Sequence, residues 1–113
     1  CNLNIDIQYD NAQLNMTKEE EINIYRIIQE IIHNTIKHAK ATSLSIQFKV
    51  DHNKLYLITT DNGIGFDFDR QSAKNAGLGL YNLQSRAEVI NAKFSFQSET
   101  TKGTKFIFEI PVN

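Results

Sequence analysis

The chain of 113 residues is 41% hydrophobic and 22% charged, which is the composition of one soluble globular domain. Its formal net charge of -1 argues against a nucleic-acid partner or a polybasic membrane contact, because either would require clustered Lys and Arg. No apolar run is long enough to span a bilayer, and the single cysteine, Cys1, can form no internal disulfide. Since the chain starts without an initiator Met, we expect a domain cut from a longer protein, in a reducing, cytosolic setting.

The first part of the chain predicts a strand followed by a long helix. Residues 3–8 alternate apolar and polar side chains, as a strand does. Thr17 and Glu20 have the spacing of a capping box, in which each side chain accepts a hydrogen bond from the other residue's backbone N–H. We therefore expect a helix from about Lys18 to Ala39.

The middle of the chain predicts a hairpin and then a second helix. Residues 43–50 and 54–61 alternate strictly, and residues 51–53 between them are typical of a hairpin turn. A helical stripe of apolar residues runs through 79–90. Asn91 follows it and can adopt the left-handed conformation that ends such a helix.

The last part predicts a second hairpin, with strands at residues 93–98 and 104–112 joined across residues 100–103. The order of elements is then strand, helix, two strands, glycine-rich loop, helix, two strands. This order fits helices that cover one face of a mixed β-sheet, a two-layer α/β sandwich of the α+β kind. We expect residues 1–113 to form this one domain.

The long predicted helix carries a narrow polar stripe. Glu30, Asn34, Lys37 and His38 are spaced so that they share one face, whereas most of the circumference is apolar. The apolar residues are Ile24, Ile27, Ile28, Ile31, Ile32 and Ile36. Such a polar set could hold a hydrated divalent cation and phosphates, since hard cations prefer oxygen ligands. Taken alone, the stripe is more typical of the solvent face of an amphipathic helix, and it becomes informative only together with other motifs.

The first of two glycine clusters follows a predicted strand. Asp61 ends the strand, and a buried carboxylate there could accept a hydrogen bond from an exocyclic amino group such as that of adenine. Gly63 and Gly65 would let the backbone pass close to a flat ring. The alternative is that Asp-Asn-Gly forms a plain turn.

The second glycine cluster, Gly77 and Gly79, comes directly before the second helix. Free N–H groups at a helix N-terminus suit a phosphate, although this cluster too could be a plain turn. The glycine spacing fits neither a Walker motif nor the dinucleotide-binding fingerprint.

Together these segments resemble the Bergerat-fold ATPases, the superfamily of DNA gyrase, MutL, a heat-shock chaperone and the histidine kinases. The stretch "QEIIHNTIKHA" resembles the asparagine-bearing box, and "DNGIGF" resembles the first glycine box. "GLGLYNLQSRA" resembles the second glycine box, and "KGTKFIFEIP" resembles the closing Gly-Thr strand. Within the superfamily the chain is most similar to sensor histidine kinases of the nitrate-sensor and fatty-acid-desaturase-sensor type.

The resemblance implies an ATP site with Mg²⁺. Asn34 would be the metal ligand, and Glu30 would be the acid/base or water-orienting carboxylate. Lys37 and His38 would lie near the phosphates. The remaining site residues would be Asp61 on the adenine amino group, Gly63 and Gly65 around the adenine, Gly77, Leu78 and Gly79 with backbone N–H groups at the phosphates, and Thr104 supporting Asp61 through a bridging water. Residues 67–76 would form a short lid that orders when nucleotide binds.

The resemblance also implies that the phospho-accepting histidine lies on a separate dimerisation domain. None of the histidines here has the acceptor pattern, and we expect His33 to be a packing or solvent residue. The predicted function is therefore the ATP-binding catalytic domain of a two-component sensor histidine kinase, at the cytoplasmic end of a membrane-anchored sensor and monomeric by itself. It would act on a response regulator only indirectly. Two alternatives remain: an anti-sigma-type serine kinase of the same fold, and a non-catalytic ATP-binding switch.

Overall fold

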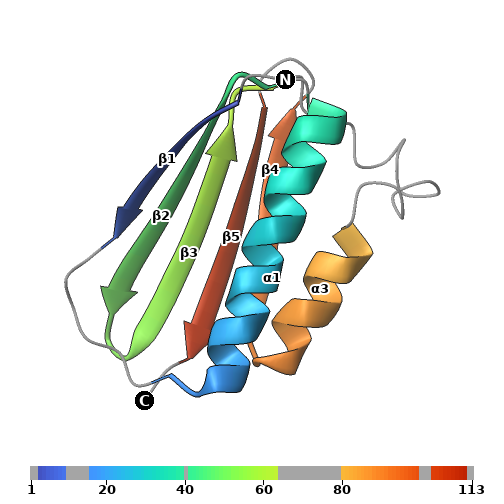
Figure 1. Ribbon diagram of the computed structural model, residues 1–113. Coiled ribbons are helices and arrows are strands. Elements are labelled where there is room, and N and C mark those ends of the chain that lie inside the picture. Colours follow the sequence, from blue (N-terminus) through green and yellow to red (C-terminus); the bar gives the residue numbers. More distant parts are fainter. Residues whose placement is uncertain (1–2, 10–15, 40, 64–79, 100–102, 112–113) are drawn as a thin grey trace.

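A computed structural model describes residues 3–9, 16–39, 41–63, 80–99 and 103–111 (Figure 1). The elements in chain order are β1 (Asn4–Tyr9), α1 (Lys18–Asn34), the π-helical turn η1 (Thr35–Ala39), β2 (Ser43–Asp51), β3 (Lys54–Asp61), α3 (Leu80–Val89), β4 (Lys93–Glu99) and β5 (Gly103–Pro111). Each strand and helix expected from the periodicity is present, with boundaries within a residue or two of the prediction, except where the long helix changes type at its end.

The strands form a five-stranded mixed sheet in the order β1-β2-β3-β5-β4. β1 is parallel to β2, and the other neighbours are antiparallel. Both helices lie on the same face of the sheet, with α3 beside α1 (Figure 1). The predicted two-layer α+β sandwich is therefore confirmed.

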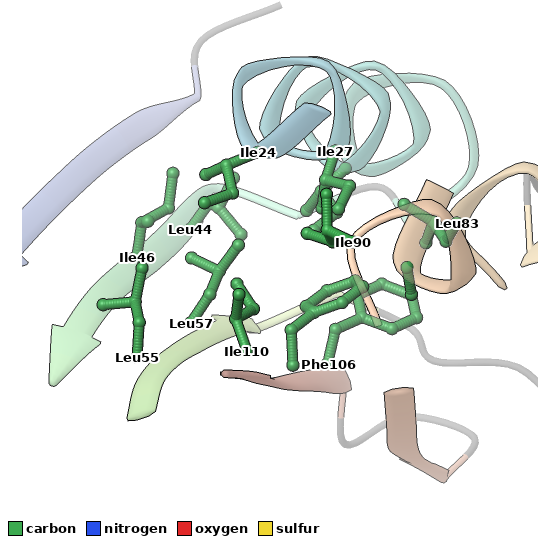
Figure 2. Packing of buried hydrophobic residues seen from close by; sticks show 13 residues of the cluster. Ile24, Ile27, Leu44, Ile46, Leu55, Leu57, Leu83, Ile90, Phe106 and Ile110 are labelled. Atoms are coloured by element: carbon green, nitrogen blue, oxygen red, sulfur yellow. The ribbon is translucent and has the colours of Figure 1, made fainter. Parts of the chain in front are cut away.

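The core lies between the helices and the sheet (Figure 2). α1 contributes Ile24, Ile27 and Ile31, whose spacing places them on the face toward the sheet. The strands and α3 supply the facing side chains, which are Leu44, Ile46, Leu55, Leu57, Leu83, Ala87, Phe106, Phe108 and Ile110, with Ile90 directly after α3. Phe94 of β4 stacks on Phe108 of β5 with ring centroids 4.8 Å apart, which extends the core to the edge of the sheet.

The turns follow the expected chemistry. His52 and Asn53 have φ values of 51° and 62°, as the two central residues of a type I′ hairpin turn require. Asn91 has a φ of 57°, and the N–H of Ala92 donates to the carbonyl of Ala87 at 2.8 Å, which closes the end of α3. The left-handed conformation predicted for Asn91 is confirmed.

α1 begins as predicted but ends differently. Its start is the capping box, with the Glu20 N–H donating to the Thr17 hydroxyl at 3.1 Å and the Thr17 N–H donating to the Glu20 carboxylate at 2.9 Å. The last residues of the predicted helix instead form the π-helical turn η1, whose wider i→i+5 bonding shifts the faces of the helix. Ile36, expected on the apolar face, lies in this turn and is 46% exposed. No helix in the described part of the chain is long and apolar enough to cross a membrane.

Candidate functional site

The carboxylate of Asp61 is buried at the end of β3, as the sequence predicts. Its Oδ1 atom accepts a hydrogen bond of 2.8 Å from the N–H of Gly63, and the backbone N–H of Thr104 also donates to the carboxylate. Burial raises the pKa of Asp61, while these two N–H groups act in the opposite direction. Because an ionised carboxylate can accept about four hydrogen bonds, Asp61 retains capacity for a further donor.

Gly103 closes the site on the β5 side. Its φ is +88°, and a Cβ added there would overlap the main-chain carbonyl of Asp61. Only glycine fits a backbone of this conformation at this approach. The next residue, Thr104, is 5% exposed, so the start of β5 is buried where it contacts Asp61. The predicted proximity of Thr104 to Asp61 is therefore present as a backbone hydrogen bond, and the bridging water stays a prediction.

Asn62 binds the end of β3 to the start of β2. Its Oδ1 accepts hydrogen bonds from the N–H groups of Thr42 and Ser43, both at 3.0 Å. Its Nδ2 donates to the Thr42 hydroxyl at 3.0 Å, and its backbone N–H donates to the Ser43 carbonyl at 3.3 Å. The sequence suggests only a turn residue at this position, since nothing local indicates that its partners lie some twenty residues earlier.

The predicted polar stripe of the long helix is divided between α1 and η1. Asn34, the last residue of α1, is half-buried, and its Nδ2 is buried without an acceptor among the described residues. Glu30 lies one turn earlier and accepts a hydrogen bond of 3.5 Å from Asn82 of α3. Lys37 is exposed on η1, and the backbone of His38 lies in the same turn. The end of α1, the end of β3 and the start of β5 all lie at one end of the sandwich (Figure 1).

Several predicted site residues cannot be placed. Gly65, Gly77, Leu78, Gly79 and the lid at 67–76 lie outside the described residues. Among those that are described, Asp61, Gly63 and Thr104 come together, while Glu30 and Asn34 lie on the helix that ends at the same end of the sandwich. The described part of the chain thus places a hydrogen-bond acceptor, Asp61, at the same end of the sandwich as Asn34, whose buried Nδ2 has no acceptor among these residues.

The sequence matches the family described as histidine kinase-, DNA gyrase B- and HSP90-like ATPase over residues 19–113, and the chain belongs to this family. Similar curated proteins are sensor histidine kinases. The sensor histidine kinase ComP of Bacillus subtilis is 32% identical over 92 residues, which are 81% of this chain and 12% of that protein. The oxygen sensor histidine kinase NreB of Staphylococcus carnosus is 30% identical over 94 residues, which are 83% of this chain and 27% of that protein.

Solved structures show the same fold. The blue-light activated histidine kinase of Erythrobacter litoralis matches with a TM-score of 0.81 at 19% identity, over 97% of this chain and 35% of that one. Of the two sensor kinases compared by sequence, ComP and NreB, the chain spans less than a third of the length of each. The fold and the family together identify it as an ATP-binding domain of the sensor histidine kinase type, and the predicted family is confirmed.

Proposed function

We propose that this domain binds ATP with Mg²⁺ at the end of the sandwich formed by Asp61 and the end of α1. In the parent protein it would transfer the γ-phosphoryl group to a histidine on a dimerisation domain outside this chain. The observation that carries the proposal is the buried Asp61 carboxylate, which is held by two backbone N–H groups and retains acceptor capacity. The exocyclic amino group of adenine is a donor of the required kind.

The described residues fit the nucleotide and the metal. Asn34 has a buried amide N–H group with no acceptor among the described residues, and a phosphate oxygen would satisfy it. The same side chain carries an oxygen, which is the ligand type that Mg²⁺ prefers. Glu30, one turn earlier, would act as the acid/base or water-orienting carboxylate, and Lys37 and His38 would lie near the phosphates. Gly63 would border the adenine, and Thr104 would hold Asp61.

The bound ion would supply neutralisation of the charge on the phosphates. The part played by the domain's own residues is positioning. Asp61 orients the base, Asn34 orients the phosphates, and Glu30 orients the attacking group or accepts its proton. The domain would work at the cytoplasmic end of a sensor whose response regulator receives the phosphoryl group from the acceptor histidine. Gly65, Gly77, Leu78, Gly79 and the lid would complete the phosphate site.

The decisive experiment is phosphoryl transfer from labelled ATP to a separately prepared acceptor domain of the parent. We expect an acid-labile phosphohistidine on the acceptor. Glu30→Gln should lower the rate about 10²–10⁴-fold with little change in ATP affinity, because a general base contributes only to the chemical step. Glu19→Gln, which changes an exposed carboxylate in the first turn of the same helix, is the matched control.

The result also separates the competing functions. ATP binding without label on any acceptor histidine would favour a nucleotide-binding switch, and an acid-stable phosphoserine on a protein substrate would favour the anti-sigma-type kinase. Either outcome would contradict histidine phosphorylation while leaving the nucleotide site intact.

A further inference from the structure

A groove between α1 and α3 opens beside Glu30, with a volume of about 540 Å³. Its lining residues are Arg26, Gln29, Glu30, His33 and Arg86. The two helices run antiparallel (Figure 1), and the hydrogen bond of 3.5 Å between Asn82 and Glu30 shows that these two residues lie at the same level. Arg26 lies one turn before Glu30 and Arg86 one turn after Asn82, so this alignment brings both guanidinium groups to the same groove.

The charges in this groove are not balanced by the described residues. Two arginines face one carboxylate, a formal balance of +1 with His33 neutral. Arg86 is half-buried, and its Nε is buried with no hydrogen-bond acceptor among the described residues. Neither Arg26 nor Arg86 forms an ion pair within the described part of the chain. An unsatisfied buried donor opposes folding, and a bound anion would satisfy it and also balance the excess positive charge of the groove.

We propose that this groove binds a phosphate-type oxyanion, either free phosphate or a phosphoryl group carried on a side chain. A guanidinium group presents a planar fork of donors that matches phosphate oxygens, and two such forks on opposite walls can share one tetrahedral anion. Gln29 and His33 also line the groove, and an amide and an imidazole can each donate a further hydrogen bond. This anion site goes beyond the proposed nucleotide site, because neither Arg26 nor Arg86 is among the residues proposed to bind adenine, phosphates or Mg²⁺.

Glu30, the proposed catalytic carboxylate, also lines this groove, so the bound anion would lie next to it. Glu30 repels a dianion, since like charges at contact distance are unfavourable in a partly buried place. Removing its charge should therefore strengthen the binding of phosphate, whereas removing a guanidinium should weaken it. General attraction to a cationic surface would give the same two signs, so a built site is distinguished by a lysine outside the groove whose removal leaves phosphate binding unchanged.

The test is a titration of the isotope-labelled, nucleotide-free chain with inorganic phosphate, followed by NMR at about pH 8, where the phosphoryl group is dianionic. Sodium chloride keeps the ionic strength constant. We expect saturable shifts of the Arg26 and Arg86 side-chain signals. Arg26→Gln and Arg86→Gln should each weaken binding about tenfold, as the loss of a hydrogen bond to a charged group implies, and Glu30→Gln should tighten it.

Lys49→Gln is the control, because it removes the same charge from an exposed residue on the sheet face away from the helices. If Arg86→Gln fails to fold, Arg26→Gln still tests the proposal, because Arg26 is exposed and its substitution should not affect folding. A second titration with phosphoserine identifies the source: equal binding indicates a phosphoryl group carried on a side chain, and binding of inorganic phosphate alone indicates the free ion.

Three results would overturn the proposal: shifts that do not saturate, an equal effect of Lys49→Gln, or complete displacement of phosphate by ATP at the nucleotide site. Because the readout is phosphate binding, a negative result would leave the proposed phosphoryl transfer untouched.

Discussion

The backbone of Gly103 lies so close to the carbonyl of Asp61 that no side chain can be accommodated between them. An added Cβ would stand 3.1 Å from the carbonyl carbon of Asp61 and nearer still to its oxygen. The glycine at the start of β5 is thus tied by shape to the aspartate at the end of β3, just beyond the last paired residues of the two strands, Thr60 and Lys105. A substitution at either residue should therefore alter the backbone position of the other.

Gly103→Ala should destabilise the domain by at least about 1–2 kcal/mol, because a residue with a Cβ is strained at this positive φ and must also push Asp61 aside. Denaturant unfolding monitored by circular dichroism measures the change. Ser95→Ala, at an exposed position of β4, is the control and should have little effect. An unchanged midpoint for Gly103→Ala would mean that the backbone relaxes without cost.

Asp61→Asn should abolish detectable ATP binding. The substitution replaces an acceptor with an amide donor, which would face both the backbone N–H groups of Gly63 and Thr104 and the adenine amino group. Calorimetric titration with ATP, with GTP as the nucleobase control, measures the loss. Retained, adenine-selective binding by the variant would remove Asp61 from the adenine site.

The stability of the fold should depend on pH through Asp61. Burial raises its pKa in the folded state above the ordinary value of 3.8, so the folded chain binds the proton more tightly than the unfolded chain does. The Asp61 contribution to the free energy of unfolding should therefore fall as the pH rises from 3.8 through the raised pKa, and it should be level below this window. Urea unfolding of the wild type and of Asp61→Ala across this range isolates the contribution.

Asp6→Ala, which alters an exposed carboxylate of β1, is the matched control for that pH series. A difference between the wild type and Asp61→Ala that grows with rising pH would contradict the raised pKa, because it would require the ionised form to be favoured by folding.

Asn34→Ala should spare binding of the adenine but remove the enhancement of ATP affinity by Mg²⁺, since the side chain would supply the metal's protein ligand. Titrations with ATP in the presence of Mg²⁺ or of a chelator measure the ratio. Asn23→Ala changes an asparagine of the same helix whose amide bonds the Glu19 carbonyl, and it should keep the full Mg²⁺ effect. A full effect in Asn34→Ala would place the metal on another residue.

Most of the fold follows from local patterns in the sequence. Alternation specifies the strands, the capping box begins α1, and left-handed Asn91 ends α3, because each depends only on neighbouring residues. Burial of Asp61 was also predictable, since it continues the period-two series of inward positions Leu55, Leu57 and Thr59.

The remaining features depend on which distant segments meet. The π-helical turn η1 is not encoded in any apolar spacing, so Ile36 was expected to continue the apolar face of one regular helix. The bonds from Asn62 to Thr42 and the juxtaposition of Arg26 with Arg86 arise only when separate elements pack together. Periodicity describes one element at a time and cannot locate such pairs.

The four hydrogen bonds that Asn62 makes to Thr42 and Ser43 have a consequence for the speed of nucleotide capture. They fix the edge next to Asp61 during folding, so the loss of conformational entropy at this edge is incurred before any ligand arrives. A donor that reaches Asp61 meets an acceptor already in its final orientation. Under the proposed function, recognition of the base at Asp61 would then require little rearrangement of this edge, and this step would not slow the encounter.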